Sequence, residues 1–137
     1  MSQQETSMLV VKPDGVARGL VDEIRRIILS RGLAIIEEVR KTLKPETVEQ
    51  LYQGVSDVSR RDYFPQLVEF MSSDSVHIFI VRGEDAVGKV RAIIGKRAPA
   101  SGIRQRWAES IIRNVAHGPH TAERAKEEIL LLAGREV

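Results

Sequence analysis

The chain has 137 residues, which is the length of one domain that can bury a sizeable core. Its content of 42% hydrophobic and 29% charged residues excludes an intrinsically disordered chain, and a net charge of +2 is too small to indicate a nucleic-acid partner by itself. The chain has no cysteine, which excludes disulfides, thiol nucleophiles and cysteine-ligated metals.

The first third of the chain predicts two strands with a helix between them. Residues 8–11 are a short apolar run typical of a buried strand, and residues 12–15 indicate a turn after it. Apolar residues recur at helical spacing over residues 20–31, and Gly32 is a helix stop. Residues 33–43 predict the second strand.

The middle of the chain predicts two helices and a third strand. A helix opens around residues 44–46 and has an apolar face that extends to Val55. Residues 56–62 are polar and turn-like, and residues 63–71 predict an amphipathic helix. Alternating apolar residues over 75–81 predict a strand.

The last third predicts a helix, a loop, a strand and a final helix. The first of these helices is closed by Gly95, and residues 96–104 indicate a short loop. Residues 111–116 predict the last strand. Thr121 is a good N-cap for the final helix, which extends to about Leu132.

This order of elements contains the split β-α-β pattern of a ferredoxin-like fold. We therefore expect one α/β (α+β) domain over residues 1–137, with a βαββαβ antiparallel sheet and helices packed on one face. No apolar stretch is long enough to span a bilayer, and the polar N-terminus lacks the build of a signal peptide. Together with the absence of cysteine, this predicts a cytoplasmic protein without membrane contact.

The sequence RNVAHG at residues 113–118 has the parts of a histidine nucleophile. His117 ends an apolar run, Gly118 gives it room, and the carboxylate of Glu128 could lie one fold-back away. Neutral imidazole is a good nucleophile near neutral pH when a hydrogen bond orients its second nitrogen. The alternative is structural: His117 would be a strand-end residue and Glu128 a solvated helix residue.

Arginine is concentrated in one third of the chain, at positions 91, 97, 104, 106 and 113. Its planar fork suits phosphate, although a solvated basic face would show the same composition. Lys12 after the first strand adds a cation, and an aromatic shelf at Tyr63 and Phe64 adds a surface for a base. Separately, these features are explained by an exposed turn lysine and a helix start in the core. Together they predict phosphoryl transfer through a phosphohistidine.

Over essentially its whole length, the chain resembles nucleoside diphosphate kinase. The strongest matches are VKPDGV at residues 11–16, followed by RGL at 18–20, and RNVAHG at 113–118. Arg61 with the Phe-Pro pair at 64–65 matches the family's Arg-x-x-Phe-Pro element. Two long motifs in the right order are a specific signal, whereas each short motif alone is weak.

The resemblance implies that His117 takes the terminal phosphate of a nucleoside triphosphate through Nδ1 and passes it to a diphosphate in a ping-pong cycle. Glu128 would hold the other ring nitrogen. The spacing from Arg104 to His117 and on to Glu128 also fits the family. Arg91 and Arg104 would neutralise the transferring phosphate, with the cofactor Mg²⁺ bridging the nucleotide phosphates rather than held by protein ligands.

The resemblance also implies where the rest of the nucleotide lies. Lys12 and Asn114 would bond the ribose hydroxyl and phosphate region, and Tyr52 would lie beside the phosphates. The base would occupy an apolar slot lined by Tyr63, Leu67 and Ile111. Stacking with few base-edge hydrogen bonds predicts tolerance of different bases.

The chain departs from the family at the edge of this site. Arg97 stands where the family usually has a threonine that contacts phosphate, and Tyr63 replaces a phenylalanine. Pro119 and His120 stand where serine and aspartate usually follow the histidine and glycine. The loop from Pro99 to Arg104 is shorter than usual, which disfavours the hexamer that this loop packs in the family. We still expect a homo-oligomer, whether dimer, tetramer or hexamer.

These residues are compatible with three candidate functions. The first is an active nucleoside diphosphate kinase, because the core chemical positions are retained. The second is a nucleotide-binding regulatory module of the same fold with weak or no turnover, motivated by Arg97 and Pro119. The third, a nucleic-acid-binding domain, is disfavoured because no strand carries paired aromatic residues for stacking. We therefore expect nucleoside di- and triphosphates as ligands and no specific nucleic acid.

Overall fold

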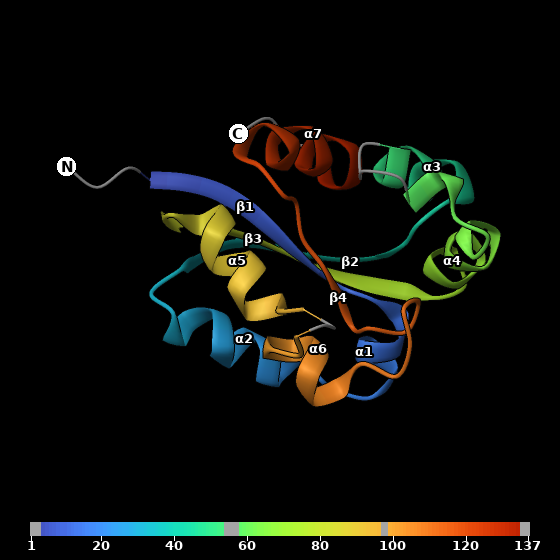
Figure 1. The fold of residues 1–137 in the computed structure, drawn as a ribbon. Coiled ribbons are helices and arrows are strands. Elements are labelled where there is room, and N and C mark those ends of the chain that lie inside the picture. Colours follow the sequence, from blue (N-terminus) through green and yellow to red (C-terminus); the bar gives the residue numbers. More distant parts are fainter. Residues whose placement is uncertain (1–3, 54–57, 97–98, 135–137) are drawn as a thin grey trace.

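The computed structural model describes residues 4–53, 58–96 and 99–134. Its core is a four-stranded sheet in the order β2-β3-β1-β4, and each neighbouring pair of strands is antiparallel (Figure 1). The strands are β1 (Gln4–Val11), β2 (Ala34–Thr42), β3 (Ser75–Glu84) and β4 (Ala116–His117). This is the ferredoxin-like sheet that the order of elements predicts.

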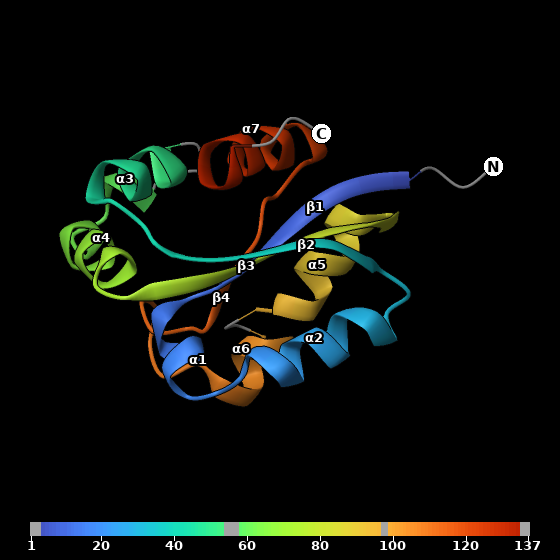
Figure 2. The same ribbon diagram turned by 180° about the vertical axis from the view of Figure 1, so that it is seen from behind.

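Helices cover both faces of the sheet (Figure 1 and Figure 2). One face is packed by α2 (Val21–Ser30), α5 (Ala86–Ile94) and α6 (Gly102–Trp107). The other is packed by α3 (Pro45–Gln53), α4 (Phe64–Ser72) and α7 (Ala122–Ala133). The prediction that the helices pack on one face is therefore wrong.

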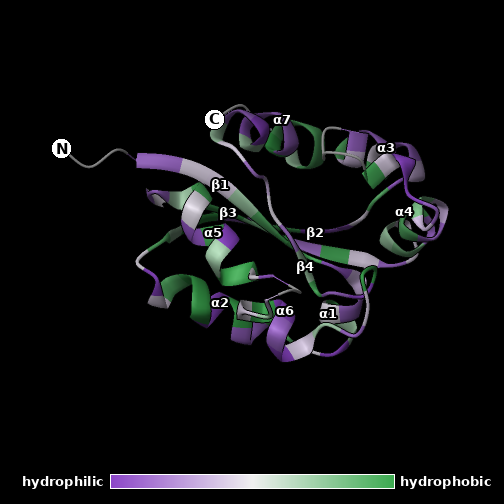
Figure 3. Cartoon of the chain, in the orientation of Figure 1, coloured by the Kyte–Doolittle hydropathy of each residue, from purple (hydrophilic) through white to green (hydrophobic). Residues whose placement is uncertain are grey.

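The central strands β1 and β3 explain why both faces need cover. Leu9 pairs with Phe79 and lies in the core under α2 and α5, whereas Met8 pairs with Ile80 and lies in the core under α3 and α7. All four side chains are fully buried. Figure 3 shows apolar residues in the middle of β1 and along β3. Successive strand residues point to opposite faces, so an uninterrupted apolar run such as residues 8–11 requires burial on both sides.

The segment after β1 is a short helix rather than the predicted turn. Lys12 is its extended N-cap, and Pro13 opens helix α1 (Pro13–Ala17). Proline suits the first helical position because its missing N–H would have no partner there and its φ is already helical. The lysine is buried, with 3% of its surface exposed, so the reading of Lys12 as an exposed turn residue is wrong.

The predicted loop over residues 96–104 is interrupted by α6, which begins at Gly102 and carries Arg104. Gly95 and Gly102 both have positive φ, and their backbones nearly touch. A Cβ on Gly102 would lie 2.5 Å from the Ile93 carbonyl oxygen, and one on Gly95 would overlap the Ser101 carbonyl. The two glycines therefore close the turn that delivers Arg104 to its place.

The last strand is much shorter than predicted, because only Ala116 and His117 pair with β1. Residues 111–115 approach it as irregular chain, and Val115 has a φ of 75°. Apolar residues alone could not reveal this, since the same residue types suit a buried loop.

The remaining predicted elements are present with shifted ends. β3 continues to Glu84, so α5 begins only at Ala86. The predicted N-cap of α7 is confirmed, because Thr121 Oγ1 accepts a hydrogen bond from the Arg124 backbone N–H at 3.0 Å. The predicted end of the second helix at Val55 lies outside the described residues, and α3 is described to Gln53.

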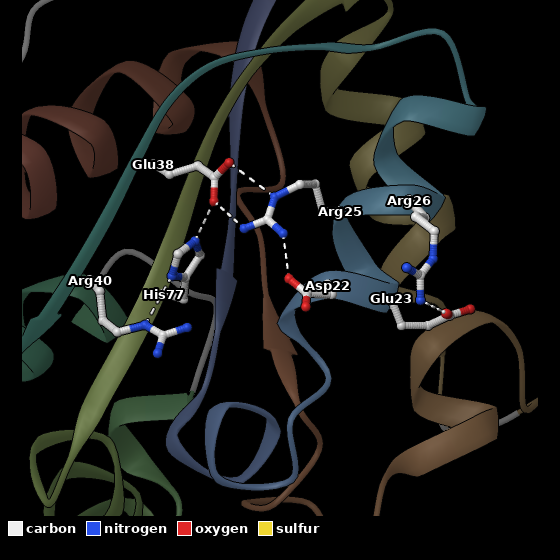
Figure 4. A network of polar contacts seen from close by, with 7 residues as sticks. All are labelled: Asp22, Glu23, Arg25, Arg26, Glu38, Arg40 and His77. Atoms are coloured by element: carbon white, nitrogen blue, oxygen red, sulfur yellow. Dashed lines mark hydrogen bonds and ion pairs between the residues drawn. The ribbon is translucent and has the colours of Figure 1, made fainter.

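A polar network ties α2 to the edge of the sheet (Figure 4). Arg25 donates to both carboxylate oxygens of Glu38, at 3.1 and 2.6 Å, and to Asp22 at 2.6 Å. Arg40 Nε donates to His77 Nδ1 at 3.1 Å, which leaves Nε2 of that ring to donate to Glu38 Oε1 at 2.6 Å. Hydrogen bonding from Arg25 holds the pKa of Glu38 below its usual range. His77 is therefore a structural histidine of this network.

Within the described residues, none of the helices combines the length and the apolar character needed to cross a membrane.

Candidate active site

Most of the predicted site residues line one pocket of about 280 Å³. This volume is just below the range of roughly 300–1,000 Å³ that is usual for small-molecule sites. The polar predicted residues in its wall are Lys12, Tyr52, Arg91, Arg104, Asn114 and His117. The apolar predicted residues there are Tyr63, Leu67 and Ile111. The wall also contains Val58 and His120, which had not been assigned to the site. Arg97 lies outside the described residues.

His117 and Glu128 form a buried pair behind the pocket wall. Nε2 of the histidine, at the end of β4, lies 2.7 Å from Oε1 of the glutamate on α7. Their exposed fractions are 5% and 1%, so the alternative of a solvated Glu128 is wrong. Because a carboxylate can only accept a hydrogen bond, Nε2 carries the proton and donates it to Glu128, which leaves Nδ1 with a free lone pair. Arg124 lies 3.2 Å from the second carboxylate oxygen as an ion pair.

Gly118 permits the close packing of this strand end. A Cβ at this position would lie 2.7 Å from Ile94 Cδ1 and 2.8 Å from Val90 Cγ1, both on α5. A side chain here would push β4 away from the sheet and displace His117.

Tyr52 on α3 packs edge-on against the ring of His117, with ring centroids 5.4 Å apart. Burial raises the pKa of its hydroxyl, which therefore stays protonated and able to donate. No hydrogen-bond partner for this buried hydroxyl is found among the described residues. An unpaired buried hydroxyl in a pocket wall is costly unless a ligand accepts its hydrogen bond.

Two arginines form the cationic end of the pocket. Arg91 on α5 donates to the Gly118 carbonyl at 3.3 Å, and Arg104 on α6 donates to the Ala116 carbonyl at 3.5 Å. Burial is the main factor that lowers the pKa of each guanidinium, and the charge of Arg91 lowers that of Arg104 further. Two half-buried, mutually repelling cations around a histidine favour a polyanionic ligand.

Lys12 lies beside them, with its Nζ 2.6 Å from Asn114 Oδ1. Asn114 in turn donates to the Ile111 carbonyl at 3.1 Å. Burial, and secondarily the charge of Arg104, lower the pKa of the lysine to about 7, although the charge of Asp14 partly opposes the shift. Lys12 is thus close to titration at neutral pH, and an anion nearby would return its proton.

Asp14 and Val115 position the segment that leads into His117. Asp14 Oδ2 accepts the Val115 backbone N–H at 3.1 Å, and the Val115 carbonyl accepts the Lys12 N–H at 2.7 Å. These bonds hold Val115 in the left-handed region, which is strained for a β-branched residue. Sequence reasoning treated Asp14 as a turn residue. Burial raises the pKa of Asp14, and this burial arises only when α1 and β4 pack together.

The opposite end of the pocket is apolar. Tyr63 is the N-cap of α4, Leu67 lies one turn along the helix and is buried, and Ile111 is 44% exposed. Val58 from the 3₁₀ helix η1 (Val58–Arg60) completes this end. Val58 lies within the polar stretch 56–62, which has no helical or strand periodicity, so nothing in the sequence indicated that this residue belongs to the site.

No carboxylate lines this pocket within the parts of the chain that the structure describes, and no cluster of metal-ligating side chains is found there. A hard cation such as Mg²⁺ prefers oxygen ligands. The wall therefore suits such an ion only when it arrives on phosphate oxygens.

Comparison with known proteins agrees with this geometry. The family model described as nucleoside diphosphate kinase matches residues 5–136. A nucleoside diphosphate kinase of Anaplasma phagocytophilum is 35% identical over 136 residues, which cover 96% of this chain and 94% of that protein. One of Maricaulis maris is 40% identical over 124 residues, which cover 88% and 86%.

Solved structures give the same result. A crystal structure of nucleoside diphosphate kinase from Encephalitozoon cuniculi has a TM-score of 0.88 and 30% identity, covering 96% of this chain and 90% of that one. A crystal form of the Aquifex aeolicus enzyme has a TM-score of 0.83 and 30% identity, covering 95% of both chains. The match of sequence and fold over nearly the whole length shows that this chain belongs to the nucleoside diphosphate kinase family.

Proposed function

We propose that the protein is a nucleoside diphosphate kinase, which transfers the terminal phosphate of a nucleoside triphosphate to a nucleoside diphosphate. The observation that carries this proposal is that His117, in the wall of a cationic pocket, is paired with the buried Glu128 behind it. The nitrogen that Glu128 does not hold is free to act as a nucleophile toward phosphorus.

The reaction is two displacements at phosphorus. The Nδ1 lone pair of His117 forms a bond to the terminal phosphorus, and the bond from that phosphorus to the bridging oxygen breaks, which releases a nucleoside diphosphate. A second diphosphate then attacks with a terminal oxygen, and the P–N bond breaks. Glu128 keeps its hydrogen bond to Nε2 throughout and stabilises the ring while it carries the phosphoryl group.

The other wall residues would bind and orient the nucleotide. Arg91 and Arg104 offset charge on the transferring phosphate, and the unpaired Tyr52 hydroxyl donates to a phosphate oxygen. Lys12 and Asn114 act as one unit toward the ribose hydroxyl and the phosphates, because they are already hydrogen-bonded to each other. When present, Mg²⁺ would be held by the nucleotide phosphates and would supply further charge neutralisation. Arg97 stays a sequence-based proposal.

The base would lie at the apolar end, against Tyr63, Leu67 and Ile111. This end offers contact surface with few fixed hydrogen-bonding groups, so it supports use of several bases. We also infer a cytoplasmic homo-oligomer. The lack of cysteine supports the compartment, and the family resemblance supports the self-association.

The test of the function is formation of the phosphorylated intermediate. The wild-type protein, incubated with ATP labelled in the terminal phosphate and with Mg²⁺, is expected to give a labelled protein that is acid-labile and base-stable. Peptide mapping should place the label on His117, and addition of GDP should release it as labelled GTP. A protein that binds ADP yet takes up no label would be a nucleotide-binding module, and the proposal would be wrong.

A second expectation concerns pH, through Lys12. Its pKa of about 7 in the free protein means that the amine loses its charge as the pH rises above neutrality, whereas bound phosphate restores the charge. Nucleotide binding above that pKa must therefore take up a proton. The ADP dissociation constant should rise by up to about tenfold between about pH 7 and pH 8.5. Calorimetry checks this, and Lys12→Met should bind more weakly with a flat profile over the same range. An equally steep profile in that variant would show that Lys12 is not the titrating group.

A further inference from the structure

His120 lies in the pocket wall and has no part in the mechanism so far. It stands between the end of β4 and the N-cap of α7, and it follows a buried proline, Pro119. Its own side chain is exposed, and it lines the pocket together with His117. Proline has a fixed φ and Thr121 is hydrogen-bonded to the start of α7, so the backbone on both sides of His120 is held in place.

The charges that reach this imidazole come from every element around it. Arg91 on α5, Arg104 on α6 and His117 on β4 disfavour its protonated form, while Glu128 on α7 favours it. Partial desolvation is the largest factor, and the net result is that the pKa of His120 is lowered from its ordinary value. His120 also shares the pocket wall with Arg91, Arg104 and His117, around which the proposed mechanism places the phosphates.

We propose that His120 is an additional phosphate-binding residue, which becomes protonated when a nucleotide polyphosphate occupies the pocket and then donates to a phosphate oxygen. This proposal rests on the nucleotide binding proposed above. In the empty pocket, the neutral ring avoids a further positive charge beside Arg91 and Arg104. Phosphate reverses the sign of the local field, so the same ring gains a proton and an anionic partner.

The inference has a definite pH signature. The contribution of His120 is absent when the pH is above its pKa in the complex. It grows as the pH falls through that value and is complete below the pKa of the free protein, which lies under the ordinary histidine value of about 6.5. Lys12 acts in a different range, at and above neutrality. The two groups can therefore be separated by pH.

The experiment is titration calorimetry of ADP, without metal, into the wild type and His120→Gln. Glutamine keeps a polar side chain that cannot take up a proton. His77→Gln is the matched control, because His77 is a histidine of the Glu38 network and does not line the pocket. The ratio of the dissociation constants, variant over wild type, should be near one at about pH 8 and rise to about threefold at about pH 6, a modest effect because the side chain is exposed.

Runs in two buffers of different ionisation enthalpy give the number of protons taken up at each pH. The difference between wild type and variant removes the titration of the nucleotide itself. Wild type is expected to take up more protons than His120→Gln on the acid side and the same number as His77→Gln throughout. A ratio that is flat with pH, or equal proton uptake in wild type and His120→Gln, would overturn the proposal.

The phosphorylation assay on the same preparations separates this inference from the proposed function. Proton-linked ADP binding that depends on His120, without any label on the wild type, would leave the inference standing and remove the kinase. Labelling of the wild type, with equal proton uptake in the wild type and His120→Gln, would support the kinase and overturn the inference about His120.

Discussion

Replacement of His117 by alanine is expected to lower the rate of phosphate exchange between ATP and GDP by at least about 10⁴-fold, because the covalent intermediate can no longer form. Among the described residues of the pocket wall, Lys12 is hydrogen-bonded to Asn114 and Tyr52 stays protonated, so neither replaces the imidazole. His120 is the other histidine of the pocket wall. Its side chain is exposed, and no carboxylate orients it among the described contacts, which favours binding over nucleophilic attack.

The same substitution should spare the binding site. The two arginines proposed to bind phosphate are hydrogen-bonded to backbone carbonyls, so ADP should bind to His117→Ala within about threefold of the wild type. Coupled-enzyme kinetics measures the exchange rate, and calorimetry measures ADP binding. Retention of acid-labile label in His117→Ala, with that label mapped to another residue, would contradict the assignment of the nucleophile.

Replacement of Glu128 by alanine is expected to lower kcat by about 100-fold and the free energy of unfolding by about 3 kcal/mol. The kinetic effect follows because the ring of His117 loses the acceptor that selects its tautomer. The loss of stability follows because the buried Nε2 of His117 loses its hydrogen-bond acceptor and Arg124 loses one of its two carboxylate partners. Glu128→Gln should be intermediate in kcat, since its amide oxygen can still accept from Nε2.

Glu127→Ala is the matched control for Glu128. Glu127 is the preceding residue of α7 and pairs with the same arginine at 2.6 Å, but its side chain is 54% exposed. We expect near wild-type kcat and a stability change of less than about 1 kcal/mol. Stopped-flow kinetics and urea unfolding measure the two effects. A kcat for Glu128→Ala within threefold of Glu127→Ala would show that the carboxylate does not position His117.

The sheet and most helices could be predicted because their signals are local. The apolar run at residues 8–11 and the alternation at 75–81 specify the central strands β1 and β3. Thr121 has the side chain that an N-cap requires, and the structure shows the bond. The chemistry could also be proposed from the sequence, because the histidine motif and Glu128 are close in sequence, and α7 folds back so that the two side chains meet.

Other parts of the site could not be predicted, because their causes are contacts between distant segments. The strain at Val115 depends on Asp14, about a hundred positions earlier, and only the pairing of β4 with β1 brings them together. The position of Arg104 on α6 depends on two glycines at which a side chain would collide with neighbouring backbone atoms. The burial that brings Lys12 close to titration is likewise a property of the assembled pocket.

The sequence by itself therefore determined the residue types available for chemistry, the order of the elements and the family. Local periodicity, capping and motif spacing are properties of neighbouring residues, so they survive without a fold. The tertiary structure alone decided that helices cover both faces, that Glu128 is buried against His117, and that His120 shares its pocket with Arg91 and Arg104. Burial and electrostatic fields arise from groups distant in the chain, and only packing sets their distances.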